Sequence, residues 1–178
     1  MKKFLLLPFV LVSFQALCQY DQLIGKDVPL MERFYVGGGF GLGFSSFSDY
    51  VAVSPNIGYR ITERGSIGIG VLYQYRNYKA SDVKTDDWGG SIFTRYKVFG
   101  PAFVAAEYEY INFEFVTATL STFRGDYSSF MVGAGIAQPI TRNVSFIISA
   151  MYNLTYRETD GGPYSSPWNL RVGISAGF

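Results

Sequence analysis

Apolar and polar residues alternate along most of the chain with a period of two. The alternation begins at Phe34, from which large apolar side chains recur at even positions up to Phe44, with mainly glycine between them. A period of two puts neighbouring side chains on opposite faces of a β-strand, so each such stretch predicts a strand with one apolar and one small or polar face. The pattern occurs in eight stretches, at residues 34–45, 51–62, 67–76, 91–98, 102–110, 129–137, 144–156 and 168–178.

The connections between these stretches alternate in length. The short ones are residues 62–66, 99–101 and 138–143, and the long polar ones are 79–87, 112–126 and 157–167. The connection at 46–49 is the exception, because it is short where a long one is expected. Short turns on one side and long loops on the other are typical of outer-membrane barrels, whose tilted strands need ~9–11 residues to cross the hydrocarbon layer. The sequence therefore predicts an all-β fold, an eight-stranded antiparallel up-and-down transmembrane β-barrel.

Aromatic residues support this prediction, because amphipathic rings concentrate where hydrocarbon meets the headgroups. One group falls at the short-turn ends of the strands: Phe34, Tyr59, Tyr96, Phe146 and Phe178. A second group falls toward the long-loop ends: Phe44, Tyr75, Trp88, Tyr110, Tyr156 and Trp168. The barrel must close, because an open sheet edge in lipid would leave backbone groups unpaired. With eight strands its interior is filled by side chains rather than by open water.

The first 18 residues have the order of a secretory signal peptide. Lys2 and Lys3 precede an apolar run over 4–14, and small residues stand at positions −3 and −1 before Gln19. We expect cleavage before Gln19, a short periplasmic segment over 19–33 and the barrel domain over 34–178. A transmembrane anchor is disfavoured because the apolar run is shorter than the ~20 residues that a spanning helix needs. A lipoprotein signal acylated at Cys18 is disfavoured by the large Leu17 before it.

Composition narrows the chemistry. Charged residues make up 16% of the chain, Cys18 is the one cysteine, and histidine is absent. Loss of Lys2 and Lys3 leaves 13 basic residues against 14 acidic ones, which indicates no basic surface for nucleic acid. Without histidine the commonest general base and metal ligand is missing. We therefore expect no enzymatic activity, no catalytic residues, no metal site and no cofactor.

The inward faces of the predicted strands carry charges. This set comprises Arg60, Arg76, Arg95, Lys97, Glu107, Glu109 and Arg171. Register counted back from the turn at Gly100 brings Arg95 within diagonal reach of Glu107, which predicts a salt bridge. Buried charges need partners, so we expect this lumenal network to plug the barrel. The alternative is that the same side chains line a narrow ion-conducting path.

The leader, the eight alternating strands and a last strand ending in Phe178 resemble the OmpA/OmpX-type family of small outer-membrane barrels. The resemblance covers the mature chain from about Arg33. It implies that the last strand is read by the outer-membrane assembly machinery. The implied signal consists of Trp168, Leu170, Val172, Ile174, Ala176 and Phe178. We expect no peptidoglycan-binding domain after the barrel, so the anchoring role of larger members is not implied.

Function is specified less well than architecture. The leading hypothesis is a monomeric structural or surface protein of the bacterial outer membrane, surrounded by outer-membrane lipid. Its contacts with an extracellular ligand or adhesion target would lie in loops 79–87, 112–126 and 157–167, which mix charges and aromatic residues. One alternative is a narrow ion pore or small-solute channel. Another is a periplasmic lipocalin-like binder, whose apolar strand faces would point inward.

Overall fold

The structure is a computed structural model, and it describes residues 28–44, 48–78, 83–116, 122–157, 163–164 and 166–177. The predicted signal peptide, most of the segment over 19–33 and the terminal Phe178 lie outside the described residues. The described part opens with a short 3₁₀ helix, η1 (Leu30–Arg33), directly before the first strand. No helix in the described ranges is long and apolar enough to span a membrane.

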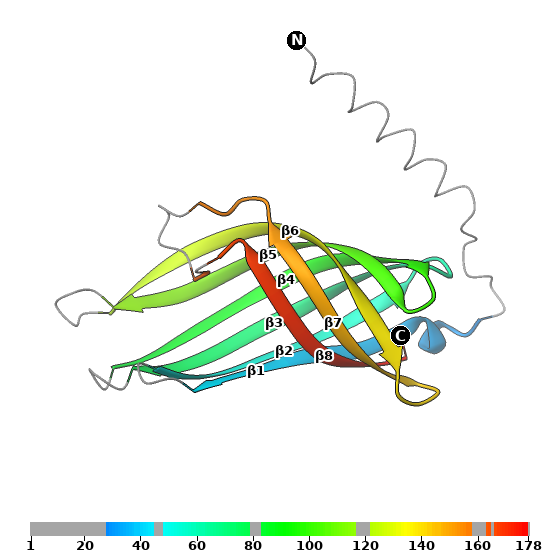
Figure 1. Cartoon of the computed structure of the whole chain (residues 1–178), viewed down its shortest axis with the longest axis horizontal. Helices are drawn as coiled ribbons and strands as arrows, with labels where there is room; N and C mark the ends of the chain where they lie inside the picture. The colour runs from blue at the N-terminus through cyan, green and yellow to red at the C-terminus, as the bar shows by residue number, and fades with distance from the viewer. Residues whose placement is uncertain are drawn as a thin grey trace, which may run out of the picture.

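The strands form a closed antiparallel barrel in which each strand pairs with its neighbours in sequence and the last pairs with the first (Figure 1). They are β1 (Phe34–Phe44), β2 (Ser48–Arg60), β3 (Gly65–Tyr78), β4 (Val83–Phe99), β5 (Ala102–Val116), β6 (Thr122–Pro139), β7 (Val144–Asn153) and β8 (Trp168–Ala176). This confirms the predicted fold class, an eight-stranded all-β barrel.

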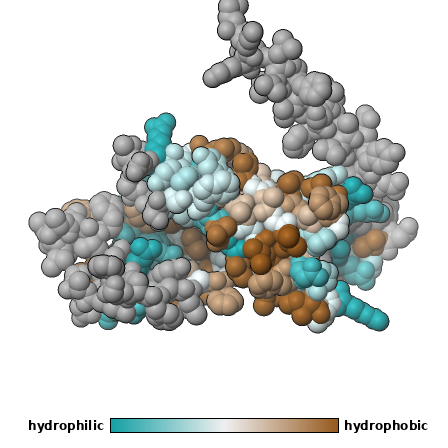
Figure 2. Space-filling view, viewed as in Figure 1, coloured by the Kyte–Doolittle hydropathy of each residue, from teal (hydrophilic) through white to brown (hydrophobic). Residues whose placement is uncertain are grey.

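Apolar side chains face outward around the barrel. Ile69 on β3 is 59% exposed and Leu170 on β8 is 77% exposed, whereas the alternate positions of both strands point into the lumen. Figure 2 shows hydrophobic residues gathered over the middle of the visible wall and hydrophilic ones toward its ends. A lipocalin-like binder would have the opposite polarity, so the structure does not support that alternative.

The short-turn half of the lumen is filled by aromatic rings that lie against glycines. A Cβ built on Gly58 would come within 2.1 Å of the Tyr35 ring, and one on Gly68 within 2.3 Å of the Phe93 ring. Tyr35 is 1% exposed, and its hydroxyl lies 3.1 Å from Oγ of Ser66. The inward glycines therefore supply the space into which rings of neighbouring strands pack.

Strand lengths differ from the prediction on the side of the long connections. Residues 83–87 belong to β4, and β5 and β6 extend to Val116 and from Thr122, so most of the loops predicted at 79–87 and 112–126 is paired strand. Polar cross-strand pairs such as Glu114 opposite Arg124 stabilise one face of these extensions, and Phe113 is buried on the other face of β5. Conversely, β7 ends at Asn153 instead of Tyr156, because the Asn153 side chain accepts a hydrogen bond from the Thr155 amide and starts a turn.

The closing seam between β1 and β8 is shorter than the others. In the described residues these strands pair over four positions, from Val36 opposite Ala176 to Gly39 opposite Gly173. β1 continues to Phe44 and β8 begins at Trp168, and there each pairs with its other neighbour only. Figure 1 shows the two strands meeting near the C-terminus and diverging toward the long-connection end.

Candidate functional site

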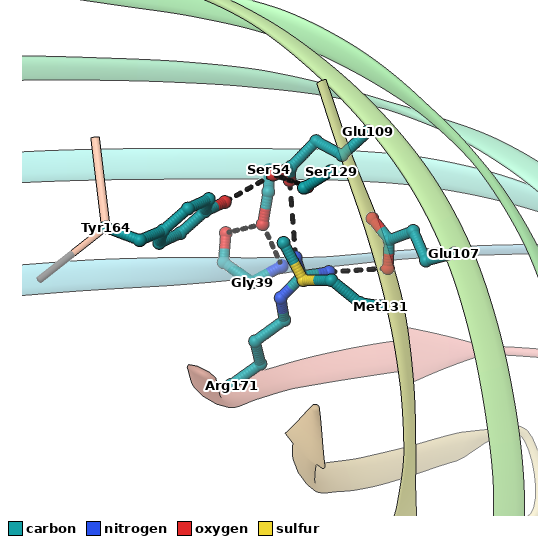
Figure 3. A network of polar contacts seen from close by, with 8 residues as sticks. All are labelled: Gly39, Ser54, Glu107, Glu109, Ser129, Met131, Tyr164 and Arg171. Atoms are coloured by element: carbon teal, nitrogen blue, oxygen red, sulfur yellow. Dashed lines mark hydrogen bonds and ion pairs between the residues drawn. The ribbon is translucent and has the colours of Figure 1, made fainter. Parts of the chain in front are cut away.

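The lumen contains a compact charge cluster built from opposite walls. Glu107 and Glu109 are two residues apart on β5, so both point inward, and Arg171 reaches them from β8 across the lumen (Figure 3). Its Nη1 lies 2.5 Å from Glu107 Oε2 and its Nη2 lies 3.2 Å from Glu109 Oε2. Glu109 is 5% exposed, so its charge depends on this pairing.

Neighbouring side chains complete the hydrogen bonding of the cluster. Ser129 donates to Glu109 Oε1 over 3.4 Å, and the hydroxyl of Tyr164 donates to the same oxygen. Nη2 of Arg171 also lies 3.4 Å from Sδ of Met131. Burial raises the pKa of Tyr164 well above its ordinary value, and the Glu109 carboxylate adds to this shift, so the phenol stays protonated and able to donate. Tyr164, which belongs to the predicted contact loop 157–167, thus reaches into the lumen.

Arg95, which was predicted to form a salt bridge with Glu107, packs against two aromatic rings. The Arg95 guanidinium lies 4.3 Å from the centre of the Phe93 ring and 5.8 Å from that of Phe103. Arg95 and Glu107 still attract each other electrostatically. Glu107 forms an ion pair with Arg171, 64 residues away in sequence, which a hairpin register could not reveal.

The remaining predicted charges lie at the two ends of the barrel. Arg60 donates to the carbonyl of Glu32 beside η1, and Lys97 lines a small cavity at the same short-turn end with Pro101 and Ser145. Arg76, at the other end of the barrel, lies near enough to Asp87 to stabilise its negative charge.

A second polar cluster, which the sequence analysis missed, lies on the strand extensions. Arg124 on β6 pairs through Nη2 with Asp86 Oδ2 at 3.2 Å and through Nε with Glu114 Oε1 at 3.3 Å. Asn112 accepts a hydrogen bond of 2.8 Å from Arg124 and donates one of 2.7 Å to Asp126. These residues were assigned to loops, so their register across β4, β5 and β6 could not be counted. Among the described residues, no group of His, Cys, Asp or Glu has the geometry of a metal site.

Comparisons with known proteins agree with the fold. No family model matches the chain, and no curated protein matches it in sequence. Among solved structures, the chain is similar to the N-terminal β-barrel domain of Pseudomonas aeruginosa OprF, with 16% identity and a TM-score of 0.53 over 81% of this chain and 96% of that one. A designed transmembrane β-barrel matches over 80% of this chain and 92% of that one, with 13% identity and a TM-score of 0.40.

The likeness to the OprF domain defines the class of fold. The chain forms an eight-stranded β-barrel whose fold resembles that of the OprF domain. At 16% identity the likeness concerns the fold alone.

Proposed function

We propose that the protein is an integral barrel of the bacterial outer membrane, with a plugged lumen and with polar strand extensions that contact the surroundings of the cell. The observation that supports this most directly is the apolar outer wall. Exposed apolar patches above a few hundred Å² are rare on soluble monomers. In lipid, by contrast, the same side chains meet a solvent as apolar as themselves.

Aromatic pairs at both ends of the wall support the same proposal. Phe34 and Tyr59 lie edge to face near the short turns, with ring centres 5.0 Å apart. Tyr152 and Trp168 make a pair of the same kind, also 5.0 Å apart, toward the opposite end. Rings of this kind are enriched at the two membrane interfaces, so the pairs suit the borders of a lipid-facing belt.

The filling of the lumen favours a plugged barrel over an ion pore. Tyr35 and Phe93 occupy its short-turn half, and Arg171 bridges it by pairing with Glu107 and Glu109. An ion crossing the lumen would have to displace charges that already satisfy each other. We therefore expect no steady conductance from the protein in planar bilayers.

The extensions of β4, β5 and β6 suit a surface role. They reach past the apolar wall, and one of their faces carries charged side chains, such as Asp86, Arg124 and Asp126. Paired strands hold such side chains more rigidly than loops do, which lowers the entropy lost on binding a partner. Contact with an extracellular ligand is the proposed role, and recognition of β8 by the assembly machinery is the proposed route into the membrane.

The test is heat-modifiable gel mobility of the mature chain refolded in detergent. We expect unboiled protein to migrate differently from boiled protein. Ile69→Arg, in the outward belt, should weaken insertion into lipid vesicles, since an arginine facing the bilayer midplane costs ~2–4 kcal/mol. Glu63→Arg, in the exposed turn between β2 and β3, is the control and should insert normally. Protein that stays soluble without detergent and shows no shift would contradict the proposal.

A further inference from the structure

A cavity lies where β1 and β8 diverge. Its volume is about 410 Å³, and it is lined by residues from both faces of the wall. Phe40, Leu170 and Val172 are outward-facing residues of its lining, whereas Ala52 and Ser54 face the lumen. Because β1 and β8 are not paired beyond Gly39, the cavity reaches the outer face of the wall between these two strands.

The strand edges around this opening explain why it exists. Beyond Gly39 the register of β1 with β8 stops, although both strands continue. At that point the Gly39 amide donates to Ser54 Oγ over 3.2 Å, and the Ser54 hydroxyl lies 3.3 Å from the Gly39 carbonyl oxygen (Figure 3). A side chain of β2 thus engages the backbone of β1 where its pairing with β8 ends.

Small residues leave the space behind the opening empty. On the inward face of this half, Gly39, Gly41 and Gly70 carry no side chain, and Ala52 carries only a methyl group. The large rings lie in the other half, where Tyr35 and Phe93 pack against their glycines. A volume of 410 Å³ falls in the range of about 300–1,000 Å³ that is usual for small-molecule sites.

The charges that line the cavity balance each other. Arg95 and Arg171 are positive, Glu107 and Glu109 are negative, and Arg171 is already paired with both carboxylates. An ionic head group would find no net opposite charge there and would have to give up its own hydration. An uncharged head group with hydroxyls could instead exchange hydrogen bonds with polar side chains of the lining, such as Gln74.

We propose that this opening is a lateral binding site for an amphipathic molecule of the membrane, with a single acyl chain and an uncharged, hydroxyl-bearing head group. The head group enters the lumen through the gap between β1 and β8. The acyl chain stays outside, on Phe40, Leu170 and Val172. The proposal rests on the membrane location proposed above, because only a barrel in lipid presents this gap to acyl chains.

Photolabelling of the refolded mature protein in phospholipid vesicles tests the site. Two monoacylglycerol probes are used, one with a diazirine on the glycerol head and one with a diazirine at the end of the acyl chain. The head probe should label inward Ala52 and Ser54, and excess unlabelled monoacylglycerol should reduce this labelling at least tenfold. The chain probe should label outward residues such as Val53 and Leu170, which reports membrane insertion separately.

The outcomes separate the two proposals. Chain labelling at Val53 without head labelling at Ser54 would overturn the lateral site and leave the membrane barrel standing. Absence of chain labelling would overturn the membrane barrel itself. If a fatty acid with a photoreactive carboxyl end labels Ser54 as strongly as the monoacylglycerol does, the site does not prefer an uncharged head group, and that part of the proposal is wrong.

Ala52→Phe is the variant that fills the cavity, and it should abolish head labelling at Ser54. Ala134→Phe, on the outward face of β6, adds the same ring elsewhere and should leave that labelling unchanged. Should Ala52→Phe fail to give the heat-modifiable form, the labelling pattern of the unsubstituted protein still decides the question.

Engineered cysteines test the gap independently, since Cys18 is the one cysteine of the chain and precedes the barrel. Val36→Cys with Ala176→Cys joins paired positions and should oxidise to a disulfide. Phe40→Cys with Val172→Cys extends the register past its end and should stay reduced. Equal oxidation of the two pairs would mean that the seam is closed and would refute the site.

Discussion

The Asp87 carboxylate on β4 accepts a hydrogen bond from the Glu114 amide on β5, at the place where the two strands separate. The Glu114 amide donates to Asp87 Oδ1 over 2.9 Å, and the Asp86 amide donates to Glu114 Oε2 over 3.3 Å. Regular pairing of β4 with β5 ends at Trp88 opposite Asn112. The two carboxylates therefore replace ladder hydrogen bonds and let the extensions diverge without losing these backbone partners.

Removal of the Asp87 carboxylate should loosen the extension of β5 specifically. In Asp87→Ala the Glu114 amide loses its acceptor, and an unsatisfied buried donor costs about 1–3 kcal/mol. We expect hydrogen exchange at Glu114 to become about tenfold faster or more, with exchange in the lipid-facing part of β5 unchanged. Lys84→Ala, at an exposed position of the same extension, is the matched control. Unchanged exchange at Glu114 would mean that Asp87 does not hold this edge.

Acid should weaken the outer part of β5 and β6 through Asp126. Hydrogen bonds from Asn112 and then Tyr110 lower the pKa of Asp126. A carboxyl group whose pKa is lower in the folded state stabilises that state above its unfolded pKa, about 3.9, and loses this contribution as pH falls through the folded pKa. Burial raises the pKa of Asp87, which acts in the opposite sense. Comparison of the unsubstituted protein with Asp126→Asn separates the contribution of Asp126 from that of Asp87.

The measurement for Asp126 is hydrogen exchange of β6 in the two proteins from pH 6 to pH 2.5. Their difference in protection should be constant above about pH 4 and shrink below it. In an Asn112→Ala background the difference should be smaller at pH values above about 4, since the largest cause of the lowered pKa is gone. A difference that does not vary with pH would show that Asp126 stays unperturbed.

Arg171→Ala should destabilise the barrel strongly. It leaves Glu107 and Glu109 buried without their cation, and removal of one partner of a buried ion pair costs about 3–5 kcal/mol. Urea unfolding of the refolded protein should show a lower midpoint, whereas Arg142→Ala in an exposed turn should have no effect. Addition of Glu107→Gln and Glu109→Gln to Arg171→Ala should recover much of the loss. If the triple variant is still destabilised, Arg171 stabilises the barrel through packing and not through its ion pairs.

The strand alternation predicted the barrel because one repeated physical rule governs every strand. Inward and outward faces follow from a period of two, so Glu107, Glu109 and Arg171 were correctly assigned to the lumen. Their pairing was not predictable, because it depends on which strands face each other across a closed barrel. A hairpin register relates only neighbouring strands, and so it pointed to Arg95.

The strand ends were predicted less well, because polarity was taken as a sign of loops. Asp86, Asn112 and Arg124 were taken for loop residues, although Asn112 and Glu114 alternate with Phe113 and Phe115 along β5. Their cross-strand pairing identifies them in the structure. The gap between β1 and β8 could not be predicted from the sequence either. Apolar and polar residues alternate through Leu170 and Val172 whether or not β1 pairs with them.

Gly58→Ala should reveal how tightly the lumen is packed. A methyl group there would lie 2.1 Å from Cζ of Tyr35, so the ring must move or the strands must part, and such overpacking costs ~1–3 kcal/mol. Gly90→Ala is the matched control, because its nearest neighbour would be 3.6 Å away, an ordinary contact. Unfolding midpoints in urea should fall for the first variant and not for the second.

Combining Gly58→Ala with Tyr35→Leu tests the cause of this loss. The smaller side chain removes the clash, so the double variant should be more stable than the sum of the two single changes predicts. Strict additivity would mean that the glycine is needed for the backbone of β2 and not for the Tyr35 ring. In that case the stability lost in Gly58→Ala would come from the β2 backbone, and replacing a ring in the lumen would not change that loss.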